Sequence, residues 1–155
     1  MANAAKENFL RQKLIPLIQE LSPTTAACWG KMNAQQMVEH LSDFFKVSTG
    51  RLSFNLVTSI EHLPKYKEFL LSEKEFRENT KAPMLPDEPF ALRHSSFTAA
   101  IEELEDELNF FFQHFSTASA TTTLHPVFGE LNYAEWVQLH HKHVKHHLKQ
   151  FGIII

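Results

Sequence analysis

Apolar residues recur every three to four positions along four long stretches of the chain, which is the spacing of an amphipathic α-helix. These stretches cover residues 4–21, 33–50, 96–115 and 132–152. No segment alternates apolar and polar residues convincingly, as a half-buried strand would. Four long helices and one long crossover region predict an all-α protein, and specifically a four-helix bundle.

Helix-start signals support two of these stretches. Asn33 and Asn132 are good N-cap residues, and each is followed three positions later by a side chain, Gln36 or Glu135, that completes a capping box. In the first stretch, Pro16 removes one backbone hydrogen-bond donor. We therefore expect the first helix to kink or restart near this proline.

The region between the second and third helices is irregular. Residues 51–92 are broken up by prolines, and a short helix is expected only over residues 65–78. The rest is predicted to be a loop long enough to form a lid or wall over a site. The predicted fold is therefore a bundle with an irregular insertion between helices two and three. Residues 116–123 form a polar linker, and residues 125–130 form a tight connection into the last helix.

The composition is that of a soluble globular protein. The 155 residues are 43% hydrophobic and 21% charged, and this length suits a single domain over residues 1–155. The net charge of −3 comes with no basic patch of the kind that binds nucleic acid. The single cysteine, Cys28, excludes an internal disulfide and a cysteine-based zinc cluster.

Targeting signals are not found in the sequence. Residues 1–11 lack the apolar run of a signal peptide, and no stretch approaches the ~20 apolar residues of a membrane span. We therefore expect a soluble, cytoplasmic protein without a membrane partner. The apolar tail, residues 153–155, and the 14 phenylalanines make a homodimer a reasonable expectation.

Histidines concentrate near the end of the chain, where five of the ten fall within residues 140–147. In a helix, His143 and His147 lie four residues apart on one face, so both rings can bind one metal ion. Neutral imidazole is the commonest protein ligand of zinc, nickel and copper. The opposite arc of the helix is polar and is expected to face solvent: Glu135, Gln138, Lys142, Lys145 and Lys149.

Two interpretations without a metal compete with this one. A solvated surface helix accounts for His141 and His146, which lie at the borders of the apolar face. It does not account for the three histidines on that face: His140, His143 and His147. They could instead be core histidines, but each buried imidazole then needs its own polar partners. Several histidines at ligand spacing therefore favour a metal site.

A catalytic metal site has three protein ligands and an open position for water or substrate, so a facing helix must supply the third ligand. His40 is the best candidate, because it is the only histidine of the second helix and lies at the flank of its buried stripe. On spacing alone, four rivals remain: His62, His94, His114 and His125.

Several other catalytic motifs are absent. The chain has no His-Glu-x-x-His and no Glu-x-x-His, which argues against a zinc protease and against a di-iron carboxylate bundle. It also has no phosphate-binding loop and no Gly-x-Ser-x-Gly element.

Two motifs in the chain resemble those of the DinB/YfiT-like superfamily. The segment from His143 to Gln150 resembles the fourth-helix motif, and residues 29–41 resemble the second-helix motif with its metal-binding histidine. Together with residues 125–131, they look like a bacterial branch of unknown function. The resemblance implies a four-helix bundle in which three histidines bind a metal: His40, His143 and His147. It also implies a role near the site for His146 and Gln150.

The resemblance further implies a class of activity. Members of this superfamily include metal-dependent thiol S-transferases that use bacillithiol, mycothiol or glutathione, and a thiol-dependent maleylpyruvate isomerase. We therefore expect a metal-dependent enzyme, a thiol S-transferase or a hydrolase, in which zinc or nickel activates a low-molecular-weight thiol or water for a small-molecule substrate. His125 and His146 are candidates for the general base.

Two alternatives to an enzyme remain open. One is a non-catalytic metal-binding or stress-response bundle, and the other is a structural bundle whose histidines bind no metal. An open coordination position inside a pocket would favour the enzyme, whereas a closed site with four ligands would favour a structural role.

Overall fold

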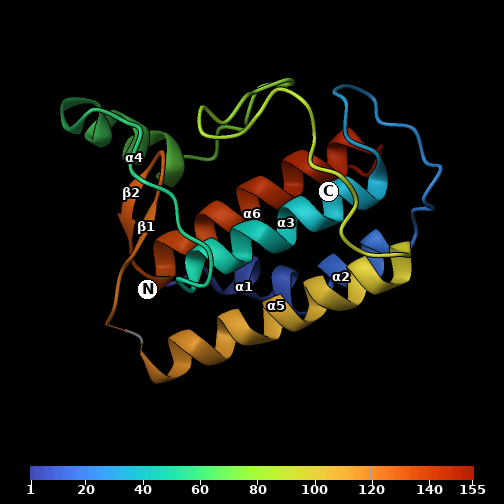
Figure 1. Ribbon diagram of the computed structural model, residues 1–155. Helices are drawn as coiled ribbons and strands as arrows, with labels where there is room; N and C mark the ends of the chain where they lie inside the picture. Colours follow the sequence, from blue (N-terminus) through green and yellow to red (C-terminus); the bar gives the residue numbers. More distant parts are fainter. Residues whose placement is uncertain (119) are drawn as a thin grey trace.

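The computed structural model describes residues 1–118 and 120–155. Within these residues the chain is mostly helical, with one 3-10 turn and two short strands (Figure 1). The elements are α1 (Ala4–Gln12), α2 (Leu14–Ile18), α3 (Ala34–Ser48), η1 (Ile60–His62), α4 (Leu63–Leu71), α5 (Phe97–Thr117), β1 (Thr123–His125), β2 (Gly129–Leu131) and α6 (Tyr133–Gln150). No helix of the described residues is both long enough and apolar enough to cross a bilayer.

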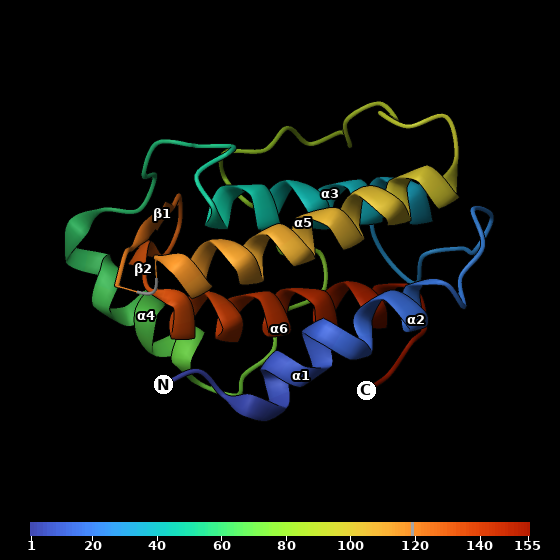
Figure 2. The ribbon, with the colours of Figure 1, turned by 90° about the horizontal axis from the view of Figure 1, so that it is seen from below.

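The first predicted helix is broken in two, as Pro16 indicated. A helical residue donates its N–H to the carbonyl four residues earlier, so Pro16 leaves the carbonyl of Gln12 without this partner. The helix is interrupted at Lys13, and α2 restarts at Leu14 with the proline in its first turn. The chain thereby bends while α1 and α2 still follow one side of the molecule (Figure 2).

Both predicted capping boxes are present. In α3, Asn33 Oδ1 accepts from the Gln36 N–H at 2.8 Å, and Gln36 Oε1 accepts from the Asn33 N–H at 2.9 Å. In α6, Asn132 and Glu135 make the same reciprocal pair at 2.9 and 3.0 Å. These local bonds define where each helix begins, and hence which side chains face the interior.

The long helices pack lengthwise around a core rich in aromatic residues. α3 runs beside both α5 and α6, while α1 and α4 pack on α6 (Figures 1 and 2). The four aromatic side chains among the largest fully buried ones come from α3, α5 and α6: Phe45, Phe111, Phe115 and Trp136. This packing brings the middle of α3 against the middle of α6, although the two helices lie far apart in the sequence.

The expectation of an all-α chain needs a correction at the hairpin. β1 and β2 form an antiparallel pair in which Thr123 faces Leu131 and His125 faces Gly129. Each strand has three residues, which is too few for an alternating pattern to be recognised in the sequence. Gly129 adopts a φ of +83°, a backbone conformation that favours glycine at this turn.

The irregular middle differs in detail from the prediction. The expected helix over residues 65–78 begins earlier and ends at Leu71, as α4. Residues 72–96, called here the covering segment, contain no helix or strand and pass over α3 and α6 (Figure 1). The predicted linker over residues 116–123 is shorter, because α5 continues to Thr117. Residue 119 of that linker lies outside the described residues.

The arc of α6 that was predicted to face solvent is partly covered. Lys142 is buried, and its Nζ donates to the carbonyl of Ser72 at 2.9 Å and to that of Lys74. Gln138 Nε2 donates to the same Ser72 carbonyl at 3.1 Å. A wheel diagram could not anticipate this, because the partners are backbone carbonyls at the start of the covering segment. These bonds fix that segment to α6.

Candidate metal centre

Three histidines from two helices converge on one point. His40 comes from α3, while His143 and His147 lie one turn apart on α6. His143 Nε2 lies 3.0 Å from His40 Nε2 and 3.1 Å from His147 Nε2. Of the described residues, these three form the group whose ligand atoms all lie within 4.8 Å of one another. We call this group the histidine trio.

The geometry of the trio fits a divalent metal. Tetrahedral coordination at 2.0–2.1 Å separates two nitrogen ligands by about 3.3 Å, close to the spacing found here. A ring nitrogen carries either one proton or one lone pair in the ring plane. His143 Nε2 therefore cannot form well-aligned hydrogen bonds to both neighbours at once. A cation shared by three lone pairs would satisfy all three nitrogens.

Burial keeps the trio neutral at physiological pH. Loss of solvation lowers the pKa of His40 to about 4. The same cause, with added repulsion from neighbouring imidazoles, lowers the pKa of His143 and His147 well below the usual 6.5. Only a neutral imidazole has a lone pair to give to a metal, so the site does not need to lose protons before binding at pH 7.

Gln150 determines which nitrogen of His147 carries the proton. The Gln150 side-chain NH₂ donates to the Trp29 carbonyl at 3.0 Å, so its oxygen must face His147. That oxygen lies 2.7 Å from His147 Nδ1 and can only accept, which places the proton on Nδ1. The lone pair of His147 is therefore on Nε2, the atom that faces the other two histidines. Such partners orient metal-binding imidazoles in many proteins.

Gly30 makes this arrangement sterically possible. A Cβ atom at Gly30 would lie 2.8 Å from Gln150 Nε2, and the glycine has a φ of +80°. Nearby, the Cys28 N–H donates to the Gln150 carbonyl at 2.7 Å. The loop before α3 thus approaches the end of α6 closely, and a side chain at position 30 would displace the Gln150 amide.

We expect Gly30→Ala to weaken metal binding at this site roughly 10- to 100-fold, the usual cost of losing an outer partner of a ligand. The displaced amide would no longer orient His147. The affinity for zinc is measured by competition with a chromophoric chelator. Gly50→Ala is the matched control, because Gly50 has a φ of +79° but no atom near its would-be Cβ. Equal losses in both variants, or none in Gly30→Ala, would contradict the role of this contact.

The trio lines a cavity of about 1800 Å³. The cavity lies between α3, α4, α6, the hairpin and the covering segment, and much of its lining is aromatic. The aromatic wall consists of Phe44, Phe54, Tyr66, Phe69, Phe76 and Phe128. Two of its rings lie beside the trio: Phe44 is 5.3 Å and Phe76 is 6.4 Å from the His143 ring, between centroids. A ligand in the cavity could therefore reach a metal held by the trio.

The two candidates for the general base have different surroundings. His125 Nδ1 accepts the backbone N–H groups of Val127 and Phe128 at 3.0 and 3.2 Å, so the proton of the neutral ring is on Nε2. Burial lowers the pKa of His125 to about 3, and the contacts of its Nδ1 stabilise the hairpin turn. His146 lines the cavity, and its ring centroid lies 5.0 Å from that of His147.

The other histidines do not join the trio. His140 stacks on Phe45 with 3.9 Å between ring centroids, and its Nε2 has no hydrogen-bond partner among the described residues. His141 packs edge-on against Phe9. The rivals for the third ligand, His62, His94 and His114, are likewise outside the group. Sequence reasoning had overlooked Gly30 as a site residue, although it stands inside the second-helix motif.

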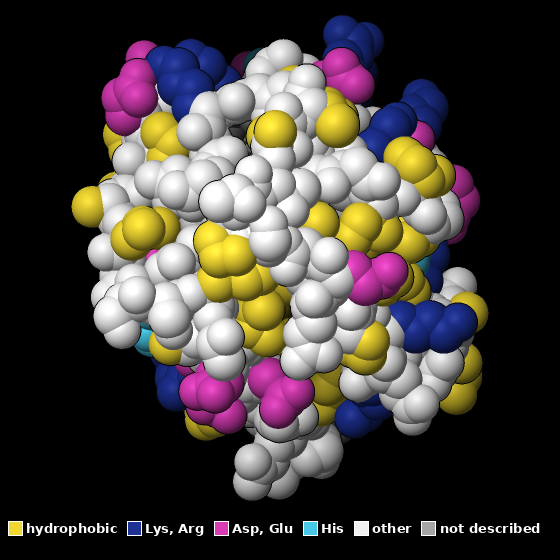
Figure 3. Space-filling view, turned by 90° about the vertical axis from the view of Figure 1, so that its right-hand side faces the viewer, with side chains coloured by type: hydrophobic (Ala, Val, Ile, Leu, Met, Phe, Trp, Pro, Cys, Tyr) yellow, Lys and Arg dark blue, Asp and Glu magenta, His cyan; other side chains and the backbone are white. Residues whose placement is uncertain are grey.

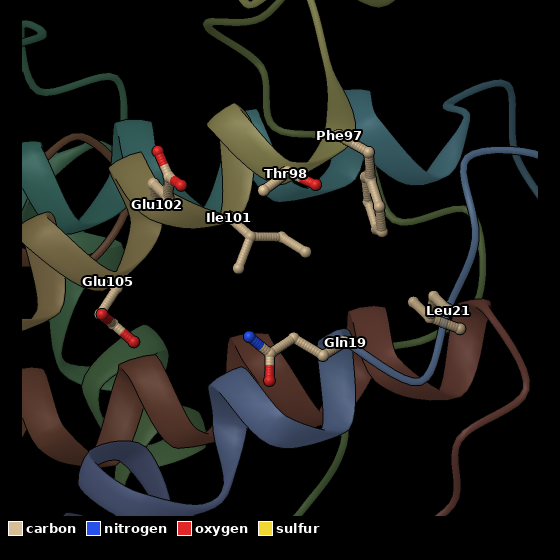
Figure 4. Close-up of a pocket in the computed structure, with 7 residues that line it drawn as sticks. All are labelled: Gln19, Leu21, Phe97, Thr98, Ile101, Glu102 and Glu105. Carbon is tan, nitrogen blue, oxygen red and sulfur yellow. The ribbon is translucent and has the colours of Figure 1, made fainter.

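A second pocket of the described residues has no histidine in its lining. A groove of about 310 Å³ lies between α2 and α5, and its ionisable side chains are Glu102 and Glu105 (Figure 4). On the face shown in Figure 3, hydrophobic side chains gather in patches near the centre, and almost no histidine is visible. Seven of the ten histidines line the large cavity: His40, His62, His125, His140, His143, His146 and His147.

Comparison with known proteins identifies the family. No curated protein and no solved structure matches the chain. The family model described as the DinB superfamily matches residues 8–151, a span that contains the whole trio and its supporting residues Gly30 and Gln150. The chain therefore belongs to the DinB superfamily.

Proposed function

We propose that this protein is a metal-dependent enzyme in which His40, His143 and His147 bind one divalent ion, zinc or nickel. The observation that carries the proposal is the convergence of three neutral imidazole Nε2 atoms at the lining of a large cavity. We also propose that residues 1–155 form one DinB-type four-helix bundle. Its helices would be α1–α2, α3, α5 and α6, with the covering segment as part of an insertion.

A divalent cation at such a site supplies a Lewis acid that lowers the pKa of a thiol or water in its open position. The protein's own residues orient the ligands, line the cavity and accept the proton. Gln150 holds the His147 lone pair toward the site, and the aromatic wall gives the cavity beside the trio an apolar lining. We propose that His146 accepts a proton at the cavity surface, because its ring lies next to that of His147 and is not part of the trio. The two reactions that fit are transfer of a low-molecular-weight thiol to an electrophile and hydrolysis.

The number of ligands favours an enzyme over a structural metal site. Structural zinc sites are usually closed by four protein ligands, whereas catalytic sites keep a position open. Among the described residues, the group of potential ligands has three members, and all three border the cavity. A non-catalytic metal-binding bundle is the alternative.

The first test is metal content. We expect about one equivalent of zinc or nickel in protein purified without an affinity tag. A ligand at 100 times its dissociation constant stabilises the native state by about 2.7 kcal/mol, so chelation should lower the melting temperature by roughly 5–10 °C. An unchanged melting curve after verified metal removal would count against a filled site.

The second test is activity. Metal-loaded protein is assayed with glutathione or bacillithiol and an electrophilic acceptor, and separately with activated esters. Turnover that disappears on chelation and returns with metal supports the enzyme. Metal binding without turnover in either assay would favour the non-catalytic alternative.

A further inference from the structure

Two side chains of the cavity lining carry a buried ring nitrogen that has no hydrogen-bond partner among the residues that the structure describes. These nitrogens are Trp136 Nε1 and His140 Nε2, and the two side chains are 0% and 1% exposed. The other unpartnered buried side-chain atoms in this part of the chain, Ser42 Oγ and His94 Nε2, lie outside the lining. Buried polar groups are nearly always paired in proteins, because an unpaired one is costly.

The packing of these two rings on the side of the core is aromatic. His140 stacks on Phe45 with 3.9 Å between ring centroids and meets Phe111 edge-on at 5.0 Å. Trp136 lies 5.6 Å from the ring of His125. That ring cannot accept the indole N–H, because its Nδ1 already accepts from the hairpin turn and its Nε2 carries the proton. A polar partner for the two nitrogens must therefore come from the cavity.

The chemistry of the two nitrogens specifies this partner. An indole N–H can only donate, so Trp136 needs an acceptor. Burial lowers the pKa of His140 well below 6.5, so its ring is neutral at pH 7 and its Nε2 either donates or accepts. Two neutral groups among aromatic rings do not offset the cost of burying an ion. An uncharged hydroxyl group fits, because it can accept from Trp136 and either donate to or accept from His140.

These two residues lie beside the candidate metal centre. Trp136, His140, His143 and His147 follow one another at intervals of three or four residues, so they share one face of α6. His140 lies about one helical turn before His143. The Phe44 ring of the aromatic wall is 5.8 Å from that of His125 and 5.3 Å from that of His143. A molecule that contacts the aromatic wall can therefore place an oxygen near Trp136 and still lie close to the trio.

We infer that the cavity binds a small, uncharged aromatic molecule with a hydroxyl group that hydrogen-bonds to Trp136 Nε1 and His140 Nε2. The aromatic wall contacts the body of this molecule. The inference rests on the proposed function, because it names the substrate class of that site. The binding contacts do not include the metal, so they can be tested without it.

The experiment compares 2-naphthol with 2-methylnaphthalene, which replaces the hydroxyl by a methyl group of similar size. Binding is measured by equilibrium dialysis after the protein has been freed of metal by chelation. We expect 2-naphthol to bind roughly tenfold tighter, since the methyl group leaves both ring nitrogens without a partner. In Trp136→Phe this ratio should fall to about one or below, while the affinity for 2-methylnaphthalene is retained and so reports an intact cavity.

Trp29→Phe is the matched control, because Trp29 also lines the cavity but is not among the buried unpartnered groups. It should keep the ratio of the wild-type protein. His140→Phe keeps an aromatic ring stacked on Phe45 and should lower the ratio as Trp136→Phe does. If Trp136→Phe does not fold, the ratio in His140→Phe decides.

Equal binding of the two compounds to wild-type protein would overturn the inference, because water alone would then satisfy the two nitrogens. An unchanged ratio in folded Trp136→Phe would overturn it as well. So would a preference that appears only after zinc is added, since the hydroxyl would then bind the metal. Metal content before chelation reports separately on the proposed function. A preference for 2-naphthol in protein that cannot bind metal would support the hydroxyl site and contradict the proposed function.

Discussion

His147→Ala should lower the affinity for zinc or nickel by more than about 100-fold, because loss of a direct ligand costs more than loss of an outer partner. The variant keeps only two of the three converging imidazoles. It also removes the His147 Nδ1–H group, from which the Gln150 side-chain oxygen accepts a hydrogen bond. Affinity is measured by chelator competition, and residual metal by elemental analysis of the purified variant. His40→Ala should behave in the same way, although this residue lies on a different helix.

Two neighbouring histidines provide the controls. His141→Ala should change the affinity little, since its ring packs on Phe9 and does not line the cavity. His140→Ala should cost stability, because the ring is stacked in the core, but metal should still bind. Loss of metal in His140→Ala with retention in His143→Ala would mean that the ligand assignment on α6 is wrong.

Acidification of the metal-free protein should unfold it between pH 6.5 and about 4. The folded pKa is lowered by burial to about 4 for His40 and about 3 for His125, and lies well below 6.5 for His140. Below pH 6.5 the unfolded chain therefore binds more protons than the folded chain. The free energy of unfolding then decreases as the pH is lowered. At pH 5, His40 and His125 each cost about 2 kcal/mol of stability. Together they remove a large part of the ~5–15 kcal/mol available to a typical domain.

The acid effect can be assigned to individual groups by urea unfolding across this pH range. His125→Asn should reduce the slope between pH 6.5 and 5 by about one proton, since the asparagine oxygen can still accept from the turn N–H groups. His62→Ala is the control, because His62 is exposed on the surface. An unchanged slope in His125→Asn would show that burial of this ring does not govern the acid sensitivity.

The sequence predicted those parts of the fold that depend only on residues close together along the chain. The capping pairs Asn33–Gln36 and Asn132–Glu135 each act within one helical turn, so their effect does not depend on the rest of the molecule. The break near Pro16 follows from the missing N–H of proline. The hairpin was missed because each strand has three residues, and the end of α4 was missed because its limits depend on packing against α6.

The candidate site was predictable to a similar extent. The spacing of His143 and His147 is a property of one helix, so their shared face could be read directly. His40 was preferred modestly over His94 and His125 for its place at the flank of the buried stripe of the second helix. The family resemblance completed the choice, since spacing cannot show which helix faces α6. The contact between Gly30 and Gln150 joins residues far apart in the chain. Likewise, the path of the covering segment depends on tertiary contacts such as those of Lys142.

The separation of the trio along the chain determines when a metal centre can form during synthesis. His40 and His143 are 103 residues apart, and α3 emerges from the ribosome long before α6 is made. Until then the nascent chain offers a single imidazole of the three, too few to retain an ion. Closing a loop of this length is also entropically costly. A metal that requires all three imidazoles can therefore load only after α6 has docked on α3, which makes metal acquisition a step that follows the synthesis of α6.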